Sequence, residues 1–272
     1  MKNLLHHIQI LFMLALLMAI HSSCSDEWQD VNDVQVNFTA TLPIDTHTRS
    51  FGKAEHINTL VAGVFNGLKE VSRQSFAVNG TSVDIQLTLP KNQTYNFVFW
   101  AYNNSSPNIY NIANLTAIKM NALPDQITFA QAEAGDAFFA TMKEVAIMGN
   151  CSYPIELVRP LAQINIGTSG VPMKASFKVK APETFYPLEN TVSEAGIDYT
   201  WNFSETTDEK FLIDENEYNY LAIGYLFAPS TATSVAVELT LTDGEKSQTV
   251  QFPQVEIEAN QRSNIVGRFT TE

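Results

Sequence analysis

The chain has 272 residues and a formal net charge of −13, with 16 basic and 29 acidic side chains, and 45% of its residues are hydrophobic. So strong a negative charge repels nucleic acids and anionic lipids, which excludes nucleic acid as an expected partner. The length and the hydrophobic fraction suffice for one large or two ordinary globular domains.

The first 23 residues have the organisation of a secretory signal peptide. Lys2 precedes an apolar run at residues 10–20, which is shorter than the roughly 20 residues that a membrane-spanning helix needs. Cys24 follows at the place of a lipidated cysteine, and the acidic residues 25–28 resemble the tag that directs Bacteroidetes lipoproteins to the outer face of the outer membrane. We therefore expect a lipid anchor on Cys24 and an acidic tether at residues 24–33. A plain signal peptide with a chance cysteine is the alternative.

Apolar and polar residues alternate in much of the remaining chain, which is the period of half-buried β-strands. The first such segment places Val34, Val36, Phe38 and Ala40 on one face. Further strands are expected at residues 83–89, 95–102, 161–166, 175–179, 197–203, 220–227, 235–241, 248–252 and 265–269. The pair Asp243-Gly244 between two alternating runs predicts a hairpin.

Helical signals are weak, because Gly135 interrupts the one suitable segment at residues 130–143, where we expect at most two turns. Many short strands separated by turn residues predict an all-β protein with two tandem β-sandwich domains of transthyretin-like or Greek-key type. A small, polar, proline-bearing stretch at residues 149–155 is the best place for the boundary. The expected organisation is a signal peptide at 1–23, the tether at 24–33, and sandwiches at 34–153 and 154–272.

Residues suited to catalysis or metal binding are scarce after the signal peptide. His47 and His56 are nine residues apart and match no zinc motif, and no nucleophile elbow or phosphate loop occurs. Asp214, Glu215 and Glu217 could bind calcium or act as a glycosidase pair, but neighbouring loop residues rarely converge on one point, so a solvated turn is expected. We therefore expect no enzymatic activity, no metal and no cofactor. A secreted hydrolase is kept as an alternative hypothesis.

Three further observations concern residues that could have more than one role. Tyr199 and Trp201 share one strand face and could stack on sugar rings, which supports an alternative function as a surface glycan-binding lipoprotein of a polysaccharide uptake system; packing in the core is the ordinary explanation. Cys151 has no disulfide partner if Cys24 carries lipid, and we expect a structural thiol rather than a nucleophile. Arg159 is expected to be a buried ion-pair partner.

Several segments together resemble the fimbrillin superfamily of Bacteroidales, the type V pilin-like surface lipoproteins. They are the lipoprotein signal with Cys24, the first strand at residues 34–42 followed by Thr48-Arg49, the sequence LVRPLAQINI at residues 157–166, and NQRSNIVG at residues 260–267. The resemblance extends over nearly the whole chain.

This resemblance implies two β-sandwich domains and a pilus assembled outside the cell, in which the partners are other pilin subunits. In such proteins an arginine-specific protease cuts after the first strand, and a strand from another subunit fills the groove. Arg49 is then the candidate cleavage site, with an ordinary loop arginine as the alternative. The side chains of the displaced strand would be Val34, Val36, Phe38 and Ala40.

The resemblance also implies an outer-membrane location through the lipid on Cys24, or release into fimbriae after cleavage, and a host or bacterial surface ligand for adhesion. The sequence continues for only three residues after Phe269, so an appended donor strand is not expected. Either residues 265–269 act as the donor, or the protein is an anchor, a tip subunit or a fimbrillin-like protein that does not polymerise.

Overall fold

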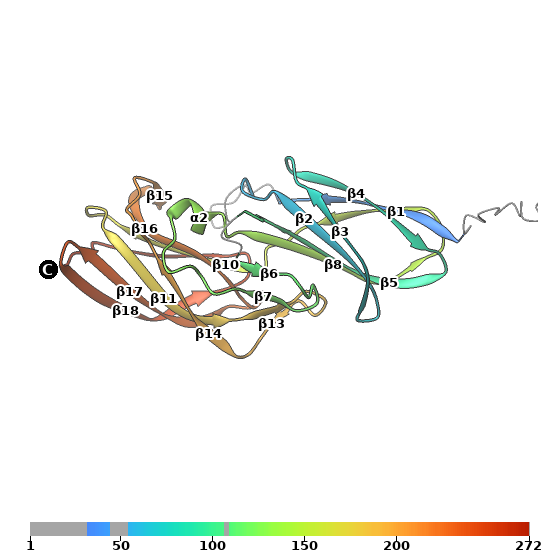
Figure 1. The fold of residues 1–272 in the computed structure, drawn as a ribbon. Helices are drawn as coiled ribbons and strands as arrows, with labels where there is room; N and C mark the ends of the chain where they lie inside the picture. Colours follow the sequence, from blue (N-terminus) through green and yellow to red (C-terminus); the bar gives the residue numbers. More distant parts are fainter. Residues whose placement is uncertain (1–31, 44–53, 106–108, 272) are drawn as a thin grey trace, which may run out of the picture.

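The structure is a computed structural model that describes residues 32–43, 54–105 and 109–271 (Figure 1). In these residues the chain is almost entirely β-strand, and the only α-helix among them is the five-residue α2 (Phe129–Glu133). No helix in the described parts of the chain has the length and hydrophobicity of a membrane span. The expectation of an all-β protein is confirmed.

The first β-sandwich packs a three-stranded sheet on a four-stranded sheet. The first of these sheets has the strand order β4 (Ser82–Pro90), β1 (Asp33–Thr41), β9 (Cys151–Glu156). The second has the order β3 (Lys69–Ala77), β2 (Thr59–Asn66), β5 (Gln93–Tyr102), β8 (Ala137–Ile147). Their inward side chains, among them Phe38, Ile85 and Phe97, form a hydrophobic core of their own.

The second β-sandwich packs two four-stranded sheets on each other. One has the order β15 (Lys210–Ile213), β16 (Asn216–Phe227), β10 (Leu161–Thr168), β19 (Arg262–Gly267). The other has the order β14 (Gly196–Asn202), β11 (Lys174–Pro182), β17 (Thr233–Asp243), β18 (Lys246–Ile257). The predicted hairpin is confirmed, since β17 and β18 are joined by two residues, of which Gly244 has a φ of 58°.

Close packing in the second core depends on one glycine. The rings of Phe177 and Trp201 stack in parallel with their centroids 4.6 Å apart. A Cβ atom on Gly224, in the facing strand β16, would lie 2.5 Å from the Phe177 ring and 2.8 Å from the Trp201 ring. Because real Cβ atoms do not approach so closely, only glycine lets the two sheets pack at this distance.

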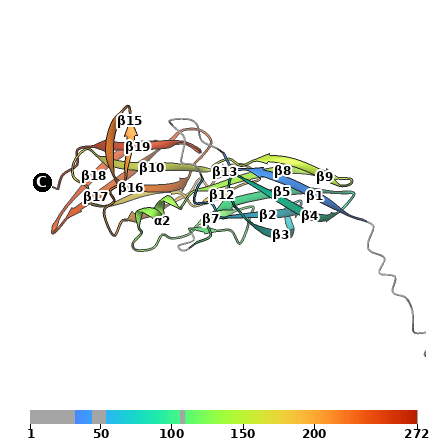
Figure 2. The ribbon, with the colours of Figure 1, turned by 90° about the horizontal axis from the view of Figure 1, so that it is seen from above.

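The two sandwiches meet end to end, so the molecule is elongated (Figures 1 and 2). A small sheet crosses the junction in the order β13 (Thr191–Val192), β12 (Thr184–Tyr186), β7 (Ile118–Met120), β6 (Tyr110–Asn111). The ring of Trp100, on the outer face of β5, packs against Tyr110, Phe185 and Phe227. Residues from 109 to 132 thus contribute to the second core, although they come before residues 149–155, where the sequence places the domain boundary. The position of that boundary stays a prediction.

Candidate functional site: the first strand and its groove

Strand β1 lies in the middle of its sheet and is hydrogen-bonded on both sides. It runs antiparallel to β4 from Asp33, opposite Pro90, to Thr41, opposite Ser82. It also runs parallel to β9, with Val36 opposite Cys151 at the start of the pairing. The alternation that predicted this strand is confirmed, because the burial of its side chains follows the same period of two.

The inward face of β1 is a row of buried apolar side chains. Val36, Phe38 and Ala40 are almost completely buried, and Leu42 continues the row just after the strand. The ring of Phe38 is within 5.0 Å of the Phe97 and Phe99 rings of the facing sheet, measured between centroids. Phe38 also stacks on Tyr153 of β9 at 5.6 Å. The strand therefore links its own sheet to the sheet opposite.

Removing β1 would leave a groove between β4 and β9 about two strand spacings wide, roughly 10 Å. Each of Val36, Phe38 and Leu42 contributes on the order of 1.5–3 kcal/mol by leaving water. Together these contributions equal a large part of the free energy of unfolding of a typical domain, which is roughly 5–15 kcal/mol. An empty groove, with two rows of unpaired backbone groups along it, would therefore strongly favour binding of another strand.

The outward face of β1 is polar and is held by side-chain hydrogen bonds. Thr39 donates to Asp84 at 3.0 Å, and Gln86 donates to Gln35 at 3.3 Å. The backbone continues the pairing beyond the strand, where the amide of Leu42 donates to the carbonyl of Thr81 at 2.8 Å. These contacts fix the register of β1.

The structure describes the chain again from Ala54, just before β2, which belongs to the facing sheet. The candidate cleavage site Arg49 and the candidate lipidated Cys24 both lie outside the described residues. Cleavage at Arg49 and the displacement of Val34, Val36, Phe38 and Ala40 stay predictions.

Cys151 borders the groove. It is half-buried, a free thiol, and lies opposite Val36 in the register of β9. A hydrogen bond with the Cys151 thiol, together with burial, raises the pKa of the Tyr153 hydroxyl. Both side chains therefore pack at the edge of the space that β1 fills.

Arg159 joins the two sandwiches through a buried ion pair. Its Nε donates to Oδ1 of Asp136 at 2.6 Å and its Nη2 donates to Oδ2 at 2.8 Å, and both side chains are buried. The third nitrogen, Nη1, donates to Asn260 at 3.1 Å, and the guanidinium lies 4.5 Å from the centre of the Phe138 ring. Burial raises the pKa of Asp136, and Arg159 acts in the opposite direction. The predicted ion-pair role of Arg159 is confirmed.

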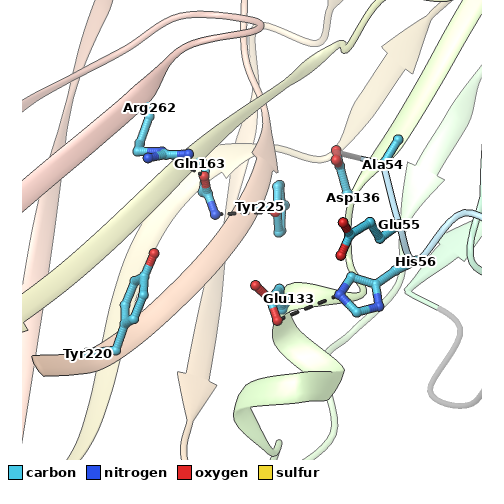
Figure 3. A pocket seen from close by; sticks show the side chains of 9 residues that line it. All are labelled: Ala54, Glu55, His56, Glu133, Asp136, Gln163, Tyr220, Tyr225 and Arg262. Carbon is cyan, nitrogen blue, oxygen red and sulfur yellow. Dashed lines mark hydrogen bonds and ion pairs between the residues drawn. The ribbon is translucent and has the colours of Figure 1, made fainter. Parts of the chain in front are cut away.

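A small polar pocket of about 120 Å³ lies beside this ion pair (Figure 3). On one side His56 is 3.6 Å from the carboxylate of Glu133. On the other side, hydrogen bonds connect Arg262 to Gln163 at 3.2 Å and Gln163 to Tyr225 at 3.2 Å. Because these side chains already have polar partners within the pocket, the pocket mainly contributes polar contacts at the junction.

Burial raises the pKa of several groups that line the pocket, Glu133 and Tyr220 among them. Burial, reinforced by nearby Glu209, raises the pKa of Glu133, while His56 lowers it. Burial also raises the pKa of Tyr220 to about 12. The described residues contain no group of three or more His, Cys, Asp or Glu side chains that could hold a metal ion.

Tyr199 and Trp201 are not available to stack on a sugar. They are on one face of β14, as expected, but this face points into the second core, where the two side chains are 2% and 1% exposed. The prediction of a glycan-stacking pair is therefore wrong for these two residues, because the buried face of the strand carries them. Asp214 and Glu215 form the turn between β15 and β16, and Glu217 pairs with Lys210 at 2.7 Å, as a solvated connection should.

Sequence reasoning did not identify the residues that complete the junction. Asp136 is the partner of Arg159 and is separated from it by 23 positions, and Asn260 is separated by 101. The one local clue was an arginine between apolar residues, which needs a buried anionic partner.

Comparisons with known proteins agree with this architecture. A family model described as "Family of unknown function (DUF6562)" matches residues 28–272. The sequence has no match among curated proteins. A solved structure of a candidate adhesin from Bacteroides ovatus is similar, with a TM-score of 0.55 and 12% identity over 88% of this chain and 90% of that chain.

Two further solved structures are similar. A candidate polysaccharide-binding protein (DUF1812) from Bacteroides thetaiotaomicron has a TM-score of 0.50 and 11% identity, over 86% of this chain and 90% of that chain. The tip fimbrial protein Mfa3 from Porphyromonas gingivalis, truncated at its C-terminus, has a TM-score of 0.48 and 11% identity, over 88% of this chain and 95% of that chain. The first two similarities, with TM-scores of 0.55 and 0.50, establish a shared fold, which confirms the β-sandwich architecture expected from the sequence.

Proposed function

Because this chain belongs to the family of unknown function DUF6562, its role has to be inferred from its fold and its site, and we propose that it is a fimbrillin-like surface lipoprotein. In this proposal it is a structural or accessory subunit of type V pili that acts in adhesion and assembles by donor-strand exchange. Its partners are other pilin subunits and a ligand on a host or bacterial surface. No step of this function requires catalysis.

The observation that carries the proposal is the position of β1. The strand is paired on both sides and fills the core with Val36 and Phe38, but it comes first in its sandwich. A single cut between β1 and β2 would leave it attached by non-covalent contacts alone. A strand of similar alternation from a second subunit could then take its place and restore both the backbone pairing and the apolar contacts.

The lipid anchor supplies the location. The expected lipidation of Cys24 would place the uncut protein on the outer membrane, with residues 24–33 as the tether. A cut after Arg49 would break the covalent link to that anchor, and the later departure of β1 would release the sandwiches and open the groove in the same step. Anchoring and polymerisation would then be mutually exclusive states of one molecule.

The thiol of Cys151 offers a direct test of groove opening. The chain from residue 24 with Cys24→Ser is digested under native conditions with an arginine-specific protease, and the new N-terminus is sequenced. An excess of a dye-labelled peptide with the sequence of residues 32–43 is added, and its incorporation is followed together with the alkylation rate of Cys151. Arg49→Ala is the matched control.

We expect a new N-terminus at Ser50, incorporation of the peptide only after cleavage, and faster alkylation of Cys151 while the groove is unoccupied. A peptide with Phe38→Asp should not incorporate, because it would bury an unpaired charge. If the cleaved protein neither exchanges its strand nor changes the reactivity of Cys151, the proposal of strand exchange is wrong.

A further inference from the structure

Three turns and the start of β1 gather at the end of the first sandwich that is farther from the junction. We call this end the entry pole and define it as residues 32–33, 67–68, 91–92 and 148–150. Backbone hydrogen bonds connect these parts: the amide of Lys91 donates to the carbonyl of Asn32 at 2.7 Å, and the amide of Asn92 donates to that of Ile147 at 2.6 Å. The Asn96 side chain donates to the carbonyl of Gly67 at 2.9 Å.

The entry pole exposes two large apolar side chains at the tips of its turns. Leu68 is 75% exposed in the two-residue turn between β2 and β3, and Met148 is 70% exposed just after β8. Such turns normally carry glycine, asparagine or other polar residues, because the tip faces water. Covering Leu68 and Met148 would be favourable, because it removes their apolar surface from water.

Charge distinguishes the entry pole from the rest of the molecule. The chain has a net charge of −13, whereas three basic and three acidic residues lie in or next to these turns. They are Asp33, Lys69, Glu70, Lys91, Lys143 and Glu144. The described residues of the pole are therefore close to neutral, and the tether before them adds Asp26, Glu27 and Asp30, so an uncharged lipid surface suits the pole better than an anionic one.

The length of the tether limits where this pole can be. Asn32 is eight residues after Cys24, so the pole can be no more than about 29 Å from a lipid attached to Cys24. The C-terminus lies at the opposite end of the elongated molecule (Figure 1). A lipid anchor would thus hold the entry pole next to the membrane and direct the second sandwich away from it.

We propose that the entry pole rests on the lipid surface, with Leu68 and Met148 inserted at the interface between headgroups and acyl chains. This inference rests on the proposed lipid anchor at Cys24. Two apolar side chains beside a lipid anchor would act as a second, weaker attachment and would fix the orientation of the molecule on the membrane.

Tryptophan quenching by brominated phosphatidylcholine measures this contact. In the full mature chain with Trp28→Phe and Cys151→Ser, single substitutions Leu68→Trp and Met148→Trp are compared with Val171→Trp and Leu212→Trp. Val171 and Leu212 are 78% and 67% exposed and lie in the second sandwich, which makes them matched controls. Circular dichroism checks that every variant is folded. Cys24 is coupled to a maleimide lipid, so that the test does not depend on acylation in the cell.

We expect the added tryptophans at positions 68 and 148 to lose about threefold more emission than those at 171 and 212, because interfacial apolar side chains are buried roughly 5–10 Å into the boundary between headgroups and acyl chains. Equal quenching at all four positions would overturn the inference. So would an emission change that follows protein concentration and not lipid, since that would identify a contact between subunits. Mass spectrometry of the protein from native membranes tests the acylation of Cys24 separately. An unmodified Cys24 with pole-specific quenching would refute the proposed anchor in the cell and leave the lipid affinity of the pole established.

Discussion

Replacing Phe38 with alanine should test whether β1 holds the first sandwich together. Phe38 is 1% exposed, and its ring has aromatic neighbours in both sheets, Phe97 and Phe99 on one side and Tyr153 on the other. Phe→Ala substitutions in cores cost about 3–5 kcal/mol, and the rigid rings around this site limit collapse into the cavity. We therefore expect a loss of about 4 kcal/mol in the free energy of unfolding of the first sandwich.

Urea unfolding followed by far-ultraviolet circular dichroism measures this loss. With a slope of about 2–3 kcal/mol/M, the midpoint should fall by about 1.3–2 M. Thr41→Ala, on the exposed face of the same strand, is the control and should cost under about 1 kcal/mol. If the two variants lose similar stability, the inward row of β1 does not have the role assigned to it here.

Three further predictions concern the junction and the second core. Arg159→Met should destabilise the protein by about 3–5 kcal/mol, because it leaves the buried carboxylate of Asp136 without its partner. The double variant with Asp136→Leu should recover most of this loss. Additive losses in urea unfolding would contradict the prediction. Glu133 has a raised pKa in the folded protein, so its contribution to stability is present below its ordinary pKa and is lost as the pH rises through the folded value. The urea midpoint of Glu133→Gln should therefore decline less between pH 4 and pH 7 than that of the unchanged protein. Parallel curves of midpoint against pH would count against this. Gly224→Ala should lower the free energy of unfolding by about 1–3 kcal/mol, because its Cβ would overlap the rings of Phe177 and Trp201. Gly149→Ala is the control and should not be destabilising by this route, because the space around Gly149 is open. Near-ultraviolet circular dichroism and thermal unfolding compare the two variants.

The sequence predicted strands where one face is exposed and the other is buried. In β1 each buried residue is followed by a more exposed one, so the period of two is visible. In β2 six consecutive residues are buried, because residues from 109 to 120 cover its second face, and the alternation disappears. The start of β8 lies within residues 130–143, where the sequence predicts up to two helical turns, because an alanine-rich sequence favours a helix locally and tertiary packing decides otherwise.

The candidate site was predictable only in its local part. Val36 and Phe38 could be assigned to one face from their spacing. The side of β14 that carries Tyr199 and Trp201 could be assigned in the same way, but not whether that side faces solvent or core. Residues of the junction pocket come from five separate places in the chain, from His56 to Arg262, and no local pattern indicates that they meet.

The mixed pairing of β1 would give any polymer built on it a direction. The strand is antiparallel to one neighbour and parallel to the other, and these two arrangements place their hydrogen-bonding groups differently. A replacement strand that entered backwards would match neither edge of the groove. Each added molecule would therefore have to arrive with the same end first, and a fibre made in this way would have two unlike ends.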